Sequence, residues 1–451
     1  MASKVYFADF RCPTWRENLP QKLARLMMTA GFGDIDMDGK YVAIKMHFGE
    51  PGNMAYLRPN WAKTVADLVK SQGGKPFLTD CNTLYIGGRK NALDHLESAY
   101  VNGFTPYSTG CHIIIADGLK GNDEVAVPVE GGEYVKEAKI GRAVMDADVF
   151  VSLTHFKGHE QAGFGGTLKN IGMGCGSRAG KMEQHNSGKP FVKQKKCVGC
   201  HACAKICAHG APTFDADNKA SIDTSKCVGC ARCLAVCPKD AIQCMYDEAP
   251  SILNKKIAEY TKAVVDGRPC FHVSLVMDVS PNCDCHGEND VPIVPNVGMF
   301  ASLDPVALDQ ACIDAVMAQP RIPTSVIGSG EACSCTDYFK AAHPDTDWES
   351  ALIHGEKIGL GSREYELVKI WGPVSGYQRK KESRTALLFA FEEKERDLYS
   401  ALRQPTAGKP DAEPDRRSEL HRTPVPPHPF RPRQRPEGAP PRTEAASAAP
   451  R

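Results

Sequence analysis

Two runs of cysteines with one shared spacing stand out in the middle of the chain. Each has the form C-x-x-C-x-x-C-x-x-x-C, and the residues are Cys197, Cys200, Cys203 and Cys207, then Cys227, Cys230, Cys233 and Cys237. Thiolates at this spacing are typical ligands of iron–sulfur clusters. Zinc prefers paired C-x-x-C ligands separated by a longer gap, and disulfides need an oxidising compartment. Neither alternative explains the third cysteine in each tight run.

The pattern resembles that of bacterial ferredoxins with two [4Fe–4S] clusters, in which the fourth cysteine of each run binds the other cluster. The sequence therefore predicts one cluster on Cys197, Cys200, Cys203 and Cys237, and a second on Cys227, Cys230, Cys233 and Cys207. Pro238 follows the second run as the pattern prefers, whereas Ala208 follows the first. Because that proline shapes the backbone and ligates nothing, the departure weakens the match only slightly.

Length and composition indicate a multidomain globular protein. The chain has 451 residues, more than one hydrophobic core usually organises, and is 42% hydrophobic and 24% charged. A formal net charge of +1 gives no general sign of a nucleic-acid or membrane partner. The N-terminus lacks the features of a secretory signal, and no apolar run is long enough to cross a bilayer. With 19 cysteines, we expect the protein in a reducing cytoplasm.

Short apolar runs alternate with helical patterns along most of the chain. This alternation predicts an α/β fold with a mostly parallel sheet flanked by helices. The predicted strands span residues 4–10, 41–47, 75–80, 113–117, 148–153, 272–278, 297–302 and 365–370. The predicted helices span residues 19–30, 61–71, 91–101, 139–146, 251–265, 306–317 and 348–359.

The alternation stops at the cysteine-rich region and resumes after it, so we expect that region to be an insert. The predicted divisions are 1–188 and 247–372 for the two parts of the α/β domain, and 189–246 for an α+β ferredoxin-type module. A helical extension is expected at 373–402. Proline, arginine, alanine and glutamate dominate residues 403–451, which predicts a disordered tail.

Polar residues follow three of the predicted parallel strands. In such sheets, binding sites gather at the carboxyl ends of the strands. The candidates for acid–base or ligand roles at these places are His47, Asp80, His155 and His159. Each alone is more often a hydrogen-bonded loop residue than a functional group. Three polar tips on one edge of one sheet favour a shared site.

A glycine-rich segment from Gly172 to Lys181 does not fit a phosphate-binding loop. A Walker loop would need glycine where Cys175 stands, and serine or threonine where Met182 stands. The glycines are better explained by a close approach of the backbone to a ligand or to the inserted module.

The segment Cys283-Asp-Cys285-His286 is the sharpest feature outside the module. Two soft ligands and an imidazole within four residues, after a predicted strand, suit zinc, iron or nickel. The sequence therefore predicts a second metal site at Cys283, Cys285 and His286. The alternative is a reactive or merely unpaired pair of thiols. If the sheet is parallel, this tip lies beside the four candidate residues named above.

Several segments resemble a family known as domain of unknown function 362. They are His47-Phe-Gly-Glu50, Thr79-Asp80-Cys-Asn82-Thr, His155-Phe-Lys-Gly-His159, residues 163–174, and residues 278–309 with Asp304-Pro-Val-Ala-Leu-Asp309. Members of that family often carry a ferredoxin-type insert with two [4Fe–4S] clusters. The resemblance covers about residues 1–370 and implies iron–sulfur binding, but no reaction comes with it.

The leading hypothesis is a cytoplasmic iron–sulfur protein that passes electrons through two clusters to or from a metal or small-molecule site on the α/β domain. A redox partner protein is expected, and the protein would then be an oxidoreductase. Two alternatives stay open. One is an electron carrier that docks a partner enzyme without catalysis of its own, and the other is a protein whose clusters only hold the fold. Neither nucleic acid nor a membrane is expected as a partner.

Overall fold

The computed structural model describes residues 2–13, 16–185, 189–330 and 334–370. The helical extension and the tail predicted at 373–402 and 403–451 lie outside these residues. Among the described helices, none combines the length and the apolar character that a bilayer crossing requires.

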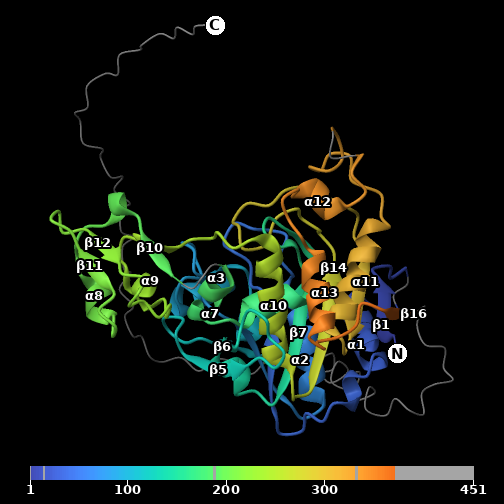
Figure 1. Cartoon of the computed structure of the whole chain (residues 1–451). Coiled ribbons are helices and arrows are strands. Elements are labelled where there is room, and N and C mark those ends of the chain that lie inside the picture. The colour runs from blue at the N-terminus through green and yellow to red at the C-terminus, as the bar shows by residue number, and fades with distance from the viewer. Residues whose placement is uncertain (1, 14–15, 186–188, 331–333, 371–451) are drawn as a thin grey trace, which may run out of the picture. The chain divides into compact units, whose positions relative to one another are not determined.

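An eight-stranded mixed sheet forms the centre of the α/β domain (Figure 1). In spatial order its strands are β16 (Tyr365–Lys369), β1 (Ser3–Asp9), β15 (Gly298–Ser302), β14 (Cys270–Val276), β7 (Val149–His155), β2 (Tyr41–Lys45), β3 (Lys75–Asp80) and β4 (His112–Ile115). Neighbours from β14 to β4 are parallel, and β1 is parallel to β16, whereas β15 is antiparallel to β1 and β14. The predicted α/β fold with a mostly parallel sheet is confirmed.

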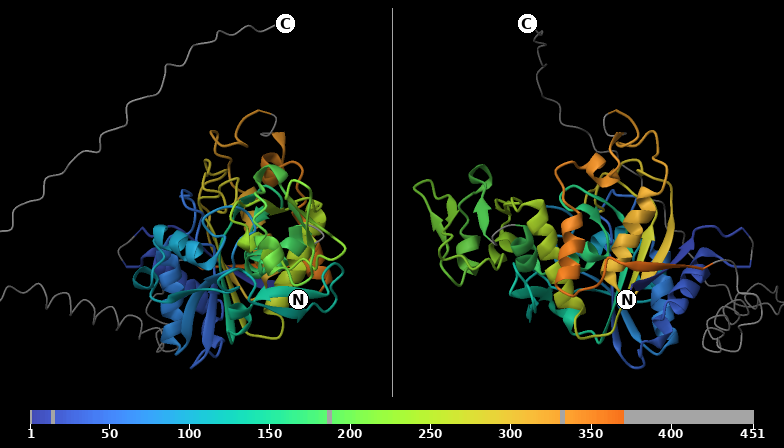
Figure 2. Two further views of the ribbon diagram at one scale, coloured as in Figure 1. Left: turned by 90° about the vertical axis from the view of Figure 1, so that its left-hand side faces the viewer. Right: turned by 45° about the vertical axis from the view of Figure 1, so that its right-hand side comes forward.

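Helices cover both faces of the sheet, which explains why its strands are almost continuously apolar. Val42 and Ile44 of β2 pack in the core beneath α1, α2 and α3, while Ala43 between them packs in the core on the other face. The first layer contains α1 (Leu19–Thr29), α2 (Pro59–Ser71) and α3 (Ala92–Val101). The opposite layer (Figure 2) contains α6 (Thr167–Cys175), α10 (Pro250–Val265) and α11 (Pro305–Met317), with α13 (Glu349–Lys357) packed against α10.

The helix predicted at 139–146 is wrong in its first half. Residues Glu137–Gly141 form strand β6, which pairs with β5 (Glu124–Pro128), and only Arg142–Met145 are helical, as α5. Ala138 and Ile140 are both fully buried and are spaced two apart, which is the strand period. The remaining short elements are α4 (Pro106–Thr109), β8 (Lys157–His159), β9 (Gly163–Gly165), α7 (Arg178–His185) and α12 (Tyr338–Ala342).

The cysteine-rich segment folds as two similar halves. Each run of cysteines contains a short helix, α8 (Ala202–Ile206) in the first and α9 (Arg232–Val236) in the second. The residue before each helix is left-handed, with φ of 57° at His201 and 55° at Ala231. The accompanying strands pair as β10 (Pro190–Val192) with β13 (Ile242–Cys244) and as β11 (Pro212–Phe214) with β12 (Ala220–Ile222). The repeated cysteine spacing therefore gives a repeated backbone.

The glycine-rich segment forms helices α6 and α7 instead of a loop. A Cβ added to Gly172 would lie 2.1 Å from the Ile257 carbonyl oxygen of α10, and one on Gly180 would lie 2.5 Å from the Lys139 carbonyl oxygen. The close backbone approach expected for these glycines is therefore made to α10 and β6. These contacts fix α6, which carries residues of the site described below.

We expect the substitution Gly172→Ala to lower the free energy of unfolding by about 1–3 kcal/mol, because the added methyl group meets rigid backbone of α10. The measurement is thermal unfolding followed by circular dichroism. Gly355→Ala in α13 is the matched control, because its Cβ would meet side-chain methyl groups and no backbone, Val306 at 3.1 Å and Leu360 at 3.6 Å. Equal melting temperatures of the two variants would contradict the packing role of Gly172.

Candidate functional site

Two hollows in the cysteine-rich segment are lined by the eight cysteines of the repeated motif. They are similar in size, about 340 and 360 Å³ counting their open mouths. The first is lined by Cys197, Cys200, Cys203 and Cys237, and the second by Cys207, Cys227, Cys230 and Cys233. Each hollow thus takes three cysteines from one run and the fourth from the other, as the sequence predicts. What occupies them stays a prediction.

The surroundings of these sulfurs suit a charged group bound by thiolates. Backbone N–H groups of Ala220 and Ala241 donate to the Sγ atoms of Cys197 and Cys237, at 3.3 and 3.2 Å. Burial and the neighbouring thiols raise the pKa of Cys233 to about 12. Four thiols held together in this way ionise with difficulty unless a metal supplies positive charge.

A second group of polar residues lies at the edge of the sheet where the parallel strands end. In the sheet, β14, β7, β2 and β3 are consecutive neighbours running in the same direction. The segments that follow these strands therefore start at the same edge. They carry most of the candidate residues predicted from the sequence.

A buried carboxylate joins the ends of β7 and β14. The Asp284 carboxylate lies 2.9 Å from His155 Nδ1 and 3.1 Å from Lys157 Nζ, and its residue is 1% exposed. Burial favours the neutral acid, but His155 and Lys157 outweigh it and lower the pKa of Asp284. The Glu50 N–H, from the segment after β2, donates to the Asp284 carbonyl oxygen at 2.9 Å. One residue therefore connects three strand ends.

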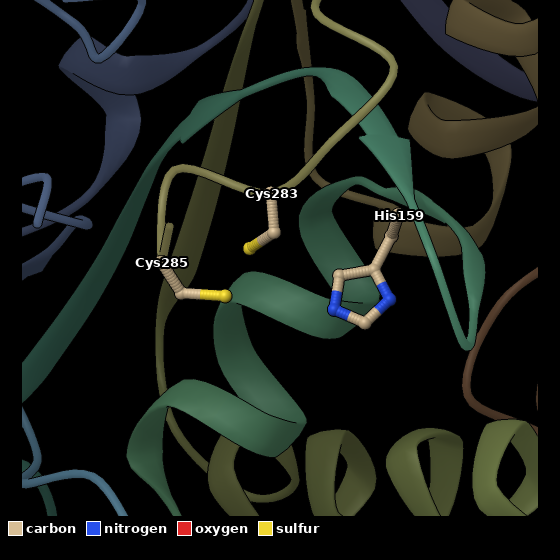
Figure 3. A group of neighbouring side chains, drawn as sticks. All are labelled: His159, Cys283 and Cys285. Carbon is tan, nitrogen blue, oxygen red and sulfur yellow. The ribbon is translucent and has the colours of Figure 1, made fainter. Parts of the chain in front are cut away.

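The two neighbours of Asp284 in sequence bring their sulfurs together with a histidine. Ligand atoms of Cys283, Cys285 and His159 all lie within 4.8 Å of one another, and Figure 3 shows the three side chains converging. The approach depends on Gly158, whose N–H donates to the Ser280 carbonyl oxygen at 2.8 Å. A Cβ on Gly158 would lie 2.1 Å from the Pro281 carbonyl oxygen, so no larger residue fits there.

Lys169 of α6 places a positive charge beside this pair of thiols. Its Nζ lies 3.6 Å from Cys283 Sγ. A hydrogen bond from the Cys285 thiol, together with Lys169 and His159, lowers the pKa of Cys283 well below its usual range, although burial opposes the shift. The same hydrogen bond and burial raise the pKa of Cys285. Cys283 is therefore the more acidic thiol of the pair.

His159 is held in one orientation by backbone groups. The N–H groups of Gln161 and Ala162 donate to its Nδ1 at 3.1 and 3.0 Å. Because Nδ1 accepts these bonds, the proton of the neutral ring is on Nε2. In Figure 3, the ring turns the edge opposite to Nδ1 toward the sulfurs. His159 is therefore arranged as a hydrogen-bond donor to the thiolate.

A second, more exposed group adjoins Cys285. Ligand atoms of Glu160, Cys285 and His286 lie within 4.8 Å of one another, and His286 Nε2 is 3.0 Å from the Glu160 carboxylate. Burial opposes the shift, but His159 and the hydrogen bond from His286 lower the pKa of Glu160 to about 2. Glu160 in turn raises the pKa of His286 against the effect of burial. In this ion pair the Glu160 carboxylate favours the protonated form of His286, so the His286 imidazolium can act as a proton donor.

Asp80 lies among other basic groups, whereas His47 lies near enough to Cys283 and Lys157 that both affect its pKa. The Asp80 carboxylate lies 3.1 Å from Lys45 Nζ and 3.6 Å from the Arg89 guanidinium, which also binds Glu50 at 2.8 Å. His47 Nδ1 accepts the Gly49 N–H at 3.0 Å. Burial, reinforced by Arg89, lowers the pKa of His47, so its ring is neutral.

The structure thus brings together some of the predicted residues and separates others. His159 joins Cys283 and Cys285, His155 joins Asp284, and Asp80 belongs to a separate ion-pair network. His286 lies with Cys285 and Glu160, so the predicted metal site at Cys283, Cys285 and His286 is divided between two groups and stays a prediction. The roles of Asp284 and Lys169 were missed, because the sequence gives no signal for either contact.

The fold and these sites define an α/β protein with a cysteine-rich segment and a thiol-bearing sheet edge. Residues 42–314 match the model of a family described as "Domain of unknown function (DUF362)". This match spans more than half of the chain, so the chain belongs to that family, in agreement with the resemblance found in its sequence.

Comparison with individual proteins adds little about function. The chain is 27% identical over 154 residues to a thylakoid-associated protein of Synechocystis; the alignment covers 32% of this chain and only 42% of that relative's length. The lactate racemase apoprotein from Thermoanaerobacterium thermosaccharolyticum aligns with 12% identity and a TM-score of 0.30, over 61% of this chain and 51% of that one. A protein from Thermotoga maritima aligns with 14% identity and a TM-score of 0.35, over 67% and 59%. Neither structural alignment supports an inference about mechanism.

We expect the substitution Asp284→Asn to destabilise the sheet edge strongly. It leaves the buried Lys157 ammonium without its carboxylate, and the free energy of unfolding should fall by about 3–5 kcal/mol. Adding Lys157→Met to that variant removes the unpaired charge and should recover part of the loss. Chemical denaturation followed by circular dichroism measures both variants. If the single and double variants lose equal stability, the ion pair contributes nothing.

The same ion pair predicts a dependence of stability on pH. The pKa of Asp284 is lowered from its ordinary value of 3.8 in the folded protein. The stabilisation is therefore fully present above about pH 4 and is lost as the pH falls below that value. Unfolding measured across this acidic range should show a steeper loss for the wild type than for Asp284→Asn. Parallel pH profiles would contradict the assignment.

Proposed function

We propose that this protein is an iron–sulfur redox protein that binds a [4Fe–4S] cluster in each of the two cysteine-lined hollows. Electrons pass through these clusters to or from a site on the α/β domain. A one-electron carrier protein is the expected partner, and the cytoplasm is the expected location. The observation that carries the proposal is the sorting of the eight motif cysteines into two sets of four.

The composition of each set supports [4Fe–4S] clusters over zinc. A zinc site of four cysteines is usually built from two C-x-x-C pairs. Here each hollow has a C-x-x-C-x-x-C triplet plus one cysteine from the other run, and the ligands of the two hollows are interlocked. A cubane cluster needs four thiolates at its corners and supplies one-electron redox chemistry when bound.

The residues around the sulfurs suit a redox role. N–H groups of Ala220 and Ala241 are directed at cluster ligands, and such bonds stabilise the negative charge gained on reduction. The first hollow is also lined by apolar side chains, among them Phe214 and Ile242. Apolar surroundings and N–H donors are the means by which a protein tunes cluster potential. A cluster that only held the fold would not require them.

Paired cysteine substitutions test the interlocked ligand sets. Cys207 and Cys230 line the same hollow, whereas Cys207 and Cys200 line different ones. The double variant Cys207→Ala/Cys230→Ala should therefore keep about half of the wild-type iron, and Cys207→Ala/Cys200→Ala should lose nearly all of it. Iron and sulfide analysis of anaerobically purified protein measures this, with electron paramagnetic resonance of the reduced protein to identify the clusters.

Cys244→Ala is the matched control, because Cys244 is buried in the same segment but lines neither hollow. It should retain full iron. If Cys207→Ala/Cys230→Ala loses nearly all of the iron while Cys207→Ala/Cys200→Ala keeps about half, each run binds its own metal and the exchange of ligands is wrong. Wild-type protein that binds zinc in place of iron under anaerobic expression would overturn the proposal itself.

A further inference from the structure

We propose that Cys283 and Cys285 form a redox-active dithiol, which the clusters reduce from its disulfide. This inference rests on the function proposed above and deepens it, because it names the group on the α/β domain that exchanges electrons. The chemistry is a two-electron dithiol–disulfide couple, matched to two clusters that each carry one electron.

The geometry supplies what such a couple needs. The two sulfurs lie within 4.8 Å of each other, and a turn in which the His286 N–H donates to the Cys283 carbonyl oxygen at 3.1 Å holds them on one short segment. Both are free thiols in this structure. Cys283 is 1% exposed, whereas Cys285 is partly accessible to solvent. Cys285 is thus the less buried residue of the pair.

Each sulfur has a neighbour suited to its role in the reduced state. Lys169 Nζ, at 3.6 Å, and the Nε2 edge of His159 stabilise negative charge on Cys283. Cys285 lies beside the ion pair of His286 and Glu160, which can deliver a proton. These neighbours place positive charge beside the Cys283 sulfur and a proton source beside the Cys285 sulfur.

The alternative occupant, a metal ion, fits less well. A histidine that binds a metal through Nε2 usually donates its Nδ1–H to an acceptor. In His159, Nδ1 instead accepts from the N–H groups of Gln161 and Ala162, which leaves the proton on Nε2. Within the described part of the chain, the positive charge of Lys169 already compensates negative charge on Cys283, and His286 compensates the charge of Glu160. A divalent cation would add uncompensated charge unless Cys285 also lost its proton.

Two tyrosines, Tyr85 and Tyr246, lie within electrostatic range of Cys285 and close in sequence to residues of the apolar cluster in the cysteine-rich segment. Leu84 packs in the apolar cluster that contains Cys197 and Cys203. The next residue, Tyr85, is near enough to Cys285 that burial and this sulfur raise its pKa. Tyr246 follows Cys244 of the same cluster; burial, Cys244 and Cys285 raise its pKa, and its ring packs on His185 at 4.8 Å.

The proposed step balances in atoms and charge. The S–S bond between Cys283 and Cys285 breaks as each reduced cluster gives up one electron, so both clusters are oxidised and the disulfide is reduced. One proton, from His286, is transferred to Cys285 Sγ, and Cys283 remains a thiolate. A one-electron carrier protein then recharges the clusters. The cycle is completed when a disulfide substrate or other two-electron acceptor oxidises the dithiol, takes up its two electrons and the proton, and restores the S–S bond.

Counting electrons in the anaerobic holoprotein tests this inference. Fully oxidised wild-type protein should take up two more electrons per chain than Cys283→Ser or Cys285→Ser, at equal iron content. Alkylation and peptide mass analysis should find Cys283 and Cys285 blocked before reduction and both labelled after it. Cys12→Ser is the matched control: this half-buried cysteine belongs to no motif, and the variant should keep the wild-type electron count.

Cluster-free protein provides the second arm. The variant Cys207→Ala/Cys200→Ala should form the same disulfide with a chemical oxidant, but a one-electron photoreductant should reduce it at least tenfold more slowly than in wild type. Equal electron counts in wild type and both serine variants would overturn the dithiol while leaving the clusters intact. A non-iron metal lost from both serine variants would replace the dithiol by a metal site. Absence of clusters from the wild type would instead overturn the proposed function.

Discussion

The buried carboxylate of Asp284 is the constraint on which the geometry of the sheet edge depends. It binds His155 at the end of β7 and Lys157 two residues later, while the Asp284 carbonyl oxygen accepts an N–H from the segment after β2. Charges buried this deeply are tolerated only when paired, so the turn that carries Asp284 has one stable position. That position sets Cys283 and Cys285 against His159. The thiol pair is therefore located by an interaction in which neither sulfur takes part.

The cysteine-rich segment follows a different principle, because each of its two sets of cysteines draws on both halves of the segment. Three of the four cysteines of each hollow lie within seven residues, and the fourth comes from the other run. Neither half can complete a set of four thiols alone. A segment of about this size buries little apolar surface. A group bound to all four cysteines of a hollow would link the two halves and compensate for that. The two halves should therefore order together when their thiolates are bound.

These two principles explain which parts of the structure the sequence predicts. The cysteine sets follow from local spacing, and most strands and helices follow from apolar periodicity, because both signals are contained in short windows. The order of the strands in the sheet is not contained in any short window of sequence. Asp80 ends β3, which lies two strands away from β7. At that position Asp80 pairs with Lys45 and Arg89 and does not join the thiol pair. His286 is adjacent to Cys285 in sequence but pairs with Glu160. The histidine that lies beside both sulfurs is His159, which is more than 100 residues earlier in the sequence. Lys169 depends on how α6 packs, which no sequence window contains.

The point at which the cysteine-rich segment enters the fold bears on how it works with the sheet edge. The Glu248 N–H donates to the His185 carbonyl oxygen at 3.1 Å, so the two ends of the segment meet. Lys256 of α10 donates to the Glu183 carbonyl oxygen at 2.9 Å and also pairs with Glu248. The segment therefore starts from helices α7 and α10, which pack on each other and on α6. Because α6 carries Lys169, the helical layer from which the segment starts also contributes the ammonium group that contacts Cys283.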